Sequence, residues 1–416
     1  MDKKPEKLVP EVRFKGFTDD WEQHKLGEIS FKVNTKNKEN LTLPVLSNSA
    51  EYGIVNQEDY FDKKIANRTD NYYIVKHNDF VYNPRISKKA PYGPIRRNTL
   101  DTKGLMSPLY YVFRINDGNY IYLDYYFKSS KWYKFMYQNG DSGARSDRFA
   151  IKDKIFQMMP ISMPNTKEQN KIGQLIQTLQ KLIDLQQRKL EQLKQLKKAM
   201  LQQLFVSKNS KQSVLRFKNF DSDWRQHSLE DISAKTYSGL TGKSKDDFGH
   251  GKARYITYLN VHNNEVAVSD GVEQIEVDSK QNKVLKGDLL FTISSEVPSE
   301  VALNSVWSSE AGTDIYLNSF CFGIRPKSNY VNSFFLTYYL RSPQMRKLIY
   351  PLAQGISRFN ISKRSILALK INTPVLPEQI SICKVLMHID NLITYQQNKL
   401  TQLTTLKRYL LQKLFI

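Results

Sequence analysis

Two stretches of about forty residues repeat each other and decide the organisation of the chain. Residues 164–205 read PNTKEQNKIGQLIQTLQKLIDLQQRKLEQLKQLKKAMLQQLF, and residues 374–415 read PVLPEQISICKVLMHIDNLITYQQNKLTQLTTLKRYLLQKLF. They share 18 identical positions in 42. A shorter repeat precedes each of them, since RFKGFTDDWEQHKLGEIS at 13–30 returns as RFKNFDSDWRQHSLEDIS at 216–233. The chain is therefore two tandem halves with matched ends, and the sequences between those ends diverge.

Each of the two longer repeats is predicted to be one long helix. Apolar residues recur at alternating spacings of four and three, which is typical of a helix that packs against another helix. Lys197 and Lys407 interrupt the two apolar stripes at equivalent places, and so does a matched pair of glutamines. The residues predicted to form this helix–helix and partner interface are Ile172, Ile176, Leu179, Ile183, Gln186, Leu190 and Leu193 in the first helix and Ile382, Leu386, Ile389, Ile393, Gln396, Leu400 and Leu403 in the second.

The ends of these helices and their connection predict how they run. Thr166 followed by Gln169 predicts a capping box, and Pro377 suits the first turn of the second helix. The polar connector at 207–213 spans at most about 25 Å, whereas the first helix is predicted to be roughly 57 Å long. Because that connector cannot carry the chain back along the helix, we expect the second helix to return antiparallel, with the globular domains at opposite ends.

The regions between the matched ends mix short β-type runs with turn residues and helix-like stretches. The predicted fold class is α+β: two tandem α/β-mixed domains separated by two long antiparallel coiled-coil helices, with a pseudo-two-fold internal repeat. The predicted boundaries are 1–163 for the first domain, 164–206 for the central helix, 207–213 for the linker, 214–373 for the second domain and 374–416 for the C-terminal helix.

The composition excludes several classes of protein. The chain carries 62 Lys and Arg against 41 Asp and Glu, a net charge of +21, which indicates a polyanionic partner such as nucleic acid. Cys321 and Cys383 are too few and too far apart for a disulfide framework or a zinc cluster, which fits a reducing cytoplasm. No apolar run approaches the roughly 18 residues of a membrane span. We expect a cytoplasmic protein with no membrane partner.

The densest basic cluster, NPRISKKAPYGPIRRNTL at 83–100, is predicted to be a loop because of its prolines and glycine. Basic residues flanked by tyrosines on a loop suit contacts with phosphates and base edges. At the aligned position the second half has TISSEVPSEVALN with Glu296 and Glu300, so the two loops cannot read the same bases. The candidate nucleic-acid contacts are Arg85, Lys88, Lys89, Tyr92, Arg96, Arg97, Arg145, Arg148, Lys243, Lys245, Lys252, Arg254 and Arg358.

Sequence patterns of catalysis are absent. SGLTGKS at 238–244 has Tyr237 where a phosphate-binding loop needs its first glycine. The six histidines show no HxxxH pair, and His24 with His227 recurs beside a tryptophan, which favours shared packing over metal binding. We assign no catalytic residue, no metal site and no cofactor to this chain.

The duplicated elements, in their order, resemble the specificity subunit of type I restriction-modification enzymes over nearly the whole chain. The closing elements carry the resemblance: Pro164, Glu168, Gln169 and Ile172, then Pro374, Glu378, Gln379 and Ile382, with Gly143-Ala144-Arg145 and Gly355-Ile356-Ser357-Arg358 upstream.

The resemblance implies a non-catalytic protein with two target recognition domains, each reading one half of a bipartite asymmetric site on double-stranded DNA. It implies two modification subunits that use S-adenosylmethionine to methylate adenine, and two restriction subunits that use ATP and Mg. Base-contacting residues do not transfer by motif, so the candidates above depend on charge and loop chemistry. Two alternatives stay open: a coiled-coil scaffold that binds protein and not DNA, and an enzyme with an unrecognised nuclease site.

Overall fold

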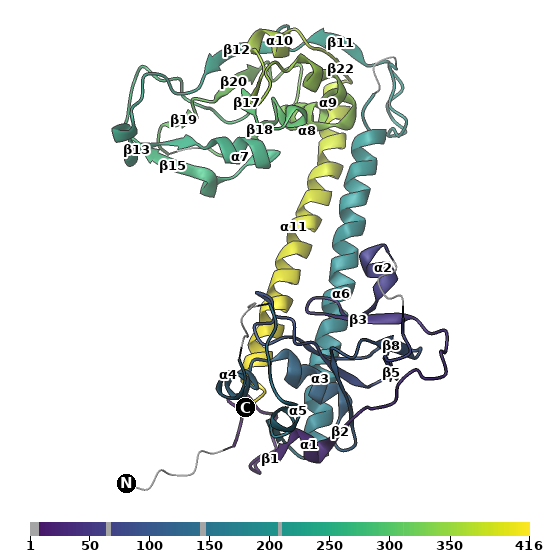
Figure 1. Ribbon diagram of the computed structural model, residues 1–416. Helices are drawn as coiled ribbons and strands as arrows, with labels where there is room; N and C mark the ends of the chain where they lie inside the picture. The colour runs from purple at the N-terminus through teal and green to yellow at the C-terminus, as the bar shows by residue number, and fades with distance from the viewer. Residues whose placement is uncertain (1–7, 64–67, 142–146, 207–209, 311) are drawn as a thin grey trace. The chain divides into compact units, whose positions relative to one another are not determined.

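The chain forms two compact units in the computed structural model, which describes residues 8–63, 68–141, 147–206, 210–310 and 312–416 (Figure 1). Unit 1 comprises the chain up to Gln187 together with Asn398–Ile416, and unit 2 comprises Arg188–Gln397. Two helices of 38 residues, α6 (Thr166–Gln203) and α11 (Leu376–Lys413), contribute a segment to each unit. The predicted long helices are confirmed, and neither is apolar enough to cross a membrane; the same holds for every helix in the described ranges.

Unit 1 is built on two four-stranded sheets. Neighbouring strands of the first are antiparallel, and the second contains one parallel pair, β3 with β8. The first sheet has the order β2 (Ser30–Lys32), β9 (Tyr111–Ile115), β6 (Phe80–Tyr82), β7 (Ile95–Arg97), and the second has the order β4 (Gly53–Asn56), β3 (Val45–Ser49), β8 (Gly104–Met106), β5 (Tyr73–Val75).

Unit 2 is built on a five-stranded and a three-stranded sheet. The five-stranded sheet has the order β12 (Ser233–Ser238), β20 (Cys321–Pro326), β16 (Leu289–Thr292), β18 (Asn304–Trp307), β14 (Val266–Ala267), and the three-stranded sheet has the order β15 (Val272–Ile275), β13 (Phe248–Ile256), β19 (Ile315–Leu317).

The two units share a strand topology that their sequences do not reveal. The order β2-β9-β6-β7 of unit 1 corresponds to β12-β20-β16-β18 of unit 2. In the second sheets, β3 pairs antiparallel with β4 and parallel with β8, as β13 pairs with β15 and β19. The divergent middles of the two halves are therefore two versions of one α+β fold, which extends the predicted internal repeat beyond the matched ends.

Short helices and closing ladders complete both units. The matched segment before each first sheet pairs with the strand before each long helix, since β1 (Glu22–Lys25) joins β10 (Pro160–Met163) and β11 (Arg225–Ser228) joins β22 (Lys370–Thr373). The short α-helices are α1 (Leu26–Ile29), α2 (Gln57–Phe61), α3 (Tyr120–Lys128), α4 (Tyr133–Asn139) and α5 (Asp153–Phe156) in unit 1, and α7 (Tyr258–Asn263), α8 (Ser333–Arg341), α9 (Pro343–Ile349) and α10 (Lys363–Leu367) in unit 2.

Within unit 1 the two helix segments are antiparallel. The first turn of α6 holds Arg13 through Glu168, and the neighbouring Val12 donates its N–H to the carbonyl of Lys413 at the end of α11. Lys407, nearly two turns before that end, donates to Gln180, which lies nearly four turns into α6. The sequence numbers therefore run in opposite directions along the pair.

Unit 2 repeats this arrangement with its own helix segments. Gln203, the last residue of α6, accepts a bond from Leu215, while Arg216 pairs with Glu378 in the first turn of α11. Lys197 of α6 forms an ion pair with Asp390 of α11 at 2.6 Å. The antiparallel pairing predicted from the short connector is thus present in each unit.

The predicted apolar stripe is the inward face of each helix. Its members from Ile172 to Leu190 in α6 and from Ile382 to Ile389 in α11 are buried, as are both glutamines, Gln186 and Gln396, while the remaining members are half-buried.

The ends of the helices pack into the cores, which explains the duplicated LF dipeptide. Leu414 and Phe415 lie in the core of unit 1, where Phe415 contacts the ring of Tyr122 at 5.3 Å. Leu204 and Phe205 lie in the core of unit 2, where Phe205 stacks on Tyr339 at 5.1 Å. Each unit therefore takes part of its core from the far end of a long helix.

The predicted helix start is corrected at one point. Asn165, and not Thr166, caps α6, since its side-chain oxygen accepts the N–H of Glu168. The side chain of Gln169 donates to the carbonyl of Pro164 and accepts the N–H of Asn119, so it does not bond the backbone of the cap residue. Pro377 does lie in the first turn of α11, as predicted.

Candidate nucleic-acid interface

The basic segment at 83–100 is only in part the predicted loop. Residues 83–94 connect β6 to β7 without regular structure, but Ile95–Arg97 form β7, the edge strand of the first sheet. The loop expectation was wrong for these residues because Ile95 is fully buried in the core and draws its neighbours into the ladder with β6.

Two candidate arginines on β7 have partners inside unit 1. Arg96 is half-buried and donates to the carbonyls of Ala50 and Ile95, and burial lowers its pKa. Arg97 donates to Asn78 and lies 3.8 Å from the carboxylate of Asp124. Both guanidinium groups therefore serve packing within the unit, which the run of basic residues did not indicate.

The structure brings two exposed candidate arginines side by side. The backbone of Arg85 pairs with that of Arg148 in an isolated antiparallel bridge. The N–H of Ile86 reaches the carbonyl of Asp147 at 3.0 Å, and the N–H of Phe149 reaches that of Pro84 at 2.8 Å. Two cations that are 63 residues apart in the sequence are thus fixed at one place on the surface, and we call this pair the Arg85–Arg148 bridge.

A tyrosine that sequence reasoning missed lies next to this bridge. Tyr110 lines one hollow together with Arg85, and a second hollow together with Pro84 and Phe149, the chain neighbours of the two arginines. Burial raises the pKa of Tyr110, and the charges of Arg85 and Arg148 act in the opposite direction. No local pattern marks it, because its neighbours come from two other segments of the chain.

The other candidates of this loop have different environments. Lys88 is exposed, and Lys89 is exposed while forming an ion pair with Glu51 at 2.8 Å. Tyr92 is half-buried and packs edge-on against Tyr133 and Phe149, each at 5.2 Å, at the edge of the core. Lys88 and Lys89 are therefore exposed enough to contact a phosphate, whereas Tyr92 packs the loop against the core of unit 1.

Unit 2 has the equivalent of the bridge. The strand β17 (Ser294–Ser295) pairs with β21 (Phe359–Asn360), so the exposed Arg358 lies against the loop between β16 and β18. Its guanidinium donates to Ser294 at 3.3 Å and lies over the ring of Phe320 at 5.1 Å. The same loop carries the exposed Glu296 and the half-buried Glu300, whose carboxylate lies 3.1 Å from Nε2 of His262. The recurrent Arg-Phe dipeptides of the sequence therefore lie against the corresponding loop in both units, although the pairing differs, since Arg148 lies opposite Arg85 whereas Asn360 lies opposite Ser294.

The remaining candidates in unit 2 divide into buried and exposed groups. Lys243 is mostly buried between Asp247 and Asp278, at 3.4 and 3.0 Å, and these interactions raise its pKa. Lys245 is exposed beside this cluster, and Lys252 with Arg254 is exposed at alternate positions of β13. The last candidate, Arg145, lies outside the described residues.

In the described ranges, no group of three or more His, Cys, Asp or Glu side chains is placed so that it could hold a metal ion. The histidines of the repeat, His24 and His227, lie on the closing strands β1 and β11 opposite Ile161 and Ile371. The buried acid–base pairs are ion pairs of the domain interior, as in Arg114 with Asp79.

These features define a class of protein: two tandem α+β units on paired long helices, each unit presenting an exposed arginine beside the loop that follows the third strand of its first sheet. Residues 18–195 and 221–405 match the family model described as type I restriction modification DNA specificity domain. The chain belongs to this family, and the resemblance stated from the duplicated motifs is confirmed.

Similar proteins have the same description. The chain is 24% identical over 287 residues to the type I restriction enzyme MjaVIII specificity subunit of Methanocaldococcus jannaschii, a match that covers 64% of this chain and 63% of that protein. It is 25% identical over 300 residues to the type I restriction enzyme StySPI specificity subunit of Salmonella potsdam, covering 70% and 64%. Each match spans less than two thirds of the relative's own length.

Solved structures show the same fold. A chain from a study of complex assembly and conformational transition of the type I R-M system matches with a TM-score of 0.55 and 16% identity over 99% of both chains. The S subunit of a type I restriction-modification system from M. genitalium matches with a TM-score of 0.55 and 15% identity, covering 98% of this chain and 99% of that one.

Proposed function

We propose that this chain is the sequence-reading subunit of a type I restriction-modification complex, in which each unit reads one half of a bipartite asymmetric site on double-stranded DNA. One observation carries the proposal: each unit has an exposed arginine, Arg148 or Arg358, in or directly before the segment that pairs with the loop after the third strand of its first sheet. A duplicated fold with a duplicated cationic position suits a target made of two parts.

The two units would read different bases. The loop of unit 1 adds Arg85, Lys88 and Lys89, whereas that of unit 2 adds Glu296 and Glu300. Guanidinium groups suit the acceptors of guanine, and carboxylates suit the amino group of cytosine. The exposed Lys245, Lys252 and Arg254 then supply phosphate contacts in unit 2, which fix the orientation of the duplex. This difference accounts for an asymmetric target.

The long helices would dock the modification subunits. Their predicted seam is buried inside the units, so the surface left for a partner is a second stripe. This stripe is duplicated at an offset of 210 residues, and its exposed members are Leu182 and Leu392, Leu185 and Tyr395, and Leu196 and Leu406. Exposed apolar side chains at helical spacing are typical of a protein interface. Two equivalent stripes suit two copies of one partner.

The chemistry would belong to the partners. In this proposal the modification subunits supply S-adenosylmethionine-dependent methylation of adenine, and two restriction subunits supply ATP- and Mg-dependent cleavage. The paired helices would set the distance between the two half-sites.

The experiment is a selection of bound duplexes from a random pool by the chain together with its modification subunits. We expect two short conserved blocks separated by a spacer of fixed length without sequence preference. Binding should weaken steeply with salt, because neutralising several phosphates releases counterions. If no duplex sequence were enriched, and the chain still held its modification subunits at every salt concentration, the result would favour the alternative of a protein-binding scaffold.

A further inference from the structure

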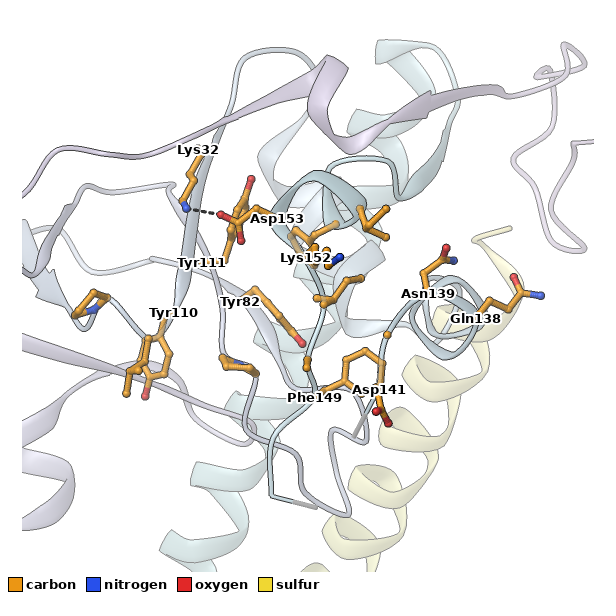
Figure 2. Close-up of a pocket in the computed structure, with 18 of the residues that line it drawn as sticks. Lys32, Tyr82, Tyr110, Tyr111, Gln138, Asn139, Asp141, Phe149, Lys152 and Asp153 are labelled. Atoms are coloured by element: carbon orange, nitrogen blue, oxygen red, sulfur yellow. Dashed lines mark hydrogen bonds and ion pairs between the residues drawn. The ribbon is translucent and has the colours of Figure 1, made fainter. Parts of the chain in front are cut away.

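An open cleft of about 860 Å³ lies in unit 1 beside the Arg85–Arg148 bridge (Figure 2). Its volume is in the range of roughly 300 to 1,000 Å³ that small-molecule sites occupy. The bridge and the cleft share a wall, since Pro84 and Phe149, the chain neighbours of the two arginines, line it. The aromatic side chains of the lining are Tyr73, Tyr82, Tyr110, Tyr111, Phe149 and Phe156.

The hydroxyl of Tyr82 is an unused donor in this cleft. The residue is 3% exposed, and its hydroxyl has no hydrogen-bond partner within the described part of the chain. Figure 2 shows its ring extending toward Phe149. Burial raises the pKa of this phenol, so it stays protonated and can donate. Because an unsatisfied buried donor costs free energy, a ligand acceptor at this position would be stabilising.

Unit 2 shows that the fold does not need this hydroxyl. Tyr82 of β6 lies directly opposite Tyr111 of β9. At the corresponding cross-strand position of unit 2, Phe291 of β16 lies opposite Phe322 of β20, with the rings stacked at 5.0 Å. The two pairs occupy the same place in the shared topology. The hydroxyls of unit 1 are thus an addition to a core that packs without them.

The charges at the rim of the cleft balance each other. Lys32 is held by Asp153 at 2.5 Å, as the dashed line in Figure 2 shows. The other charged residues of the lining are Lys152 and Asp141. Gln138 and Asn139 add neutral polar groups. The cleft therefore suits an uncharged, flat ring with polar edges, while the anion site next to it is the Arg85–Arg148 bridge.

We propose that this cleft of unit 1 binds an unpaired nucleobase, with the ring against the aromatic wall, an acceptor of its edge on the Tyr82 hydroxyl, and its phosphate at the Arg85–Arg148 bridge. This inference rests on the proposed function, because it takes DNA as the polyanion at the bridge. Stacking on aromatic side chains is the general way in which proteins hold unpaired bases, and hydrogen bonds to the edge read them. The base is one extruded from the duplex or one of a free nucleotide, which share this chemistry.

The test compares four probes on the full chain: a fully paired duplex, the same duplex with one unpaired base, the same duplex with an abasic residue at that place, and single deoxynucleoside monophosphates. We expect the unpaired base to tighten binding about tenfold over the paired and abasic duplexes. Tyr82→Phe should remove most of that gain and leave the melting temperature unchanged, because unit 2 carries Phe291 at the equivalent position. Tyr330→Phe, an exposed tyrosine of unit 2, is the matched control.

The outcomes separate the possibilities. A gain with the unpaired base that Tyr82→Phe abolishes supports the extruded base as the source, and Tyr82-dependent binding of monophosphates alone supports the free nucleotide. Equal binding of paired, unpaired and abasic duplexes, with no binding of monophosphates, overturns the inference and leaves the proposed function standing. Absence of binding to every duplex contradicts the proposed function itself.

Discussion

The guanidinium of Arg13 and the carboxylate of Glu168 form a bidentate ion pair, with Nε to Oε1 at 2.8 Å and Nη2 to Oε2 at 2.9 Å. Arg216 and Glu378 repeat both distances in unit 2. Both glutamates are fully buried. The opening repeat of each half is thus fastened to the first turn of the closing helix in the same unit, which explains why the two matched segments were duplicated together.

Glu168→Gln should destabilise unit 1 by about 1.5 to 3 kcal/mol, because it removes the charge that pairs with the half-buried guanidinium of Arg13. Hydrogen–deuterium exchange of the β1 and β10 peptides measures this loss within unit 1. Glu310→Gln, which removes an exposed pair with Lys286 in unit 2, is the control and should change no protection. If exchange in Glu168→Gln were unchanged, the ion pair between Arg13 and Glu168 would not be stabilising the pairing of β1 with β10.

Lys197→Met and Lys407→Met should lower the free energy of unfolding by different amounts, although the repeat places the two lysines at equivalent positions. Lys197 bonds Glu265 at 2.8 Å and Asp390 at 2.6 Å, so its removal should cost unit 2 about 1 to 3 kcal/mol. Lys407 donates to the neutral Gln180, and burial lowers its pKa, so methionine should cost unit 1 little. Urea denaturation of both variants checks this, and equal losses would contradict it.

The ion pair between Lys197 and Glu265 should also make the stability of unit 2 depend on pH. Burial alone would raise the pKa of Glu265, but Lys197 and Arg341 outweigh it and the pKa is lowered. A depressed carboxyl pKa contributes stability above the unfolded pKa of about 4.3, and that contribution is lost as the pH falls through the folded value. Wild type should therefore lose stability below about pH 4.5 more steeply than Lys197→Met. If the free energy of unfolding fell with pH equally in the two proteins, the ion pair with Lys197 would not be the cause of the pH dependence.

Arg85→Ala with Arg148→Ala should weaken DNA binding and reduce the slope of log affinity against log salt by about 1 to 2, because two phosphate contacts are lost. If either arginine reads a base, preference at one position of the first half-site should also relax by about 1 to 3 kcal/mol. Lys134→Ala, an exposed lysine on α4, is the control. A double variant with wild-type affinity at every salt concentration would remove the Arg85–Arg148 bridge from the interface.

The sequence predicted the parts of the fold that depend on periodicity and repetition. The stripe from Ile172 to Leu190 became the inward face of α6, and the duplicated Lys197 and Lys407 became polar contacts between helices, because a 3.6-residue period is a local property. The shared topology of the two middles was not predictable. Its strands are mostly three to six residues long, and their order is set by contacts between distant segments.

The site was predicted less well than the fold, for a related reason. Net charge and the basic run pointed to the β6–β7 loop, but composition cannot tell an exposed Arg85 from Arg97, which lies 3.8 Å from Asp124. The pairing of Arg85 with Arg148 and the nearby Tyr110 arise only when three segments meet. The unused hydroxyl of Tyr82 likewise has no local sequence pattern, because it depends on what the folded chain leaves unpaired.

The central claim is that each unit reads one half of the target. Replacing residues 31–155 with the corresponding segment of a relative of different specificity tests it directly, since the matched ends and both long helices stay unchanged. Single-molecule methylome sequencing of a strain that expresses this chimera with its modification subunits gives the target. We predict that one half of the bipartite sequence changes while the other half and the spacer stay as in wild type. A change in both halves, or a continuous target, would contradict the account.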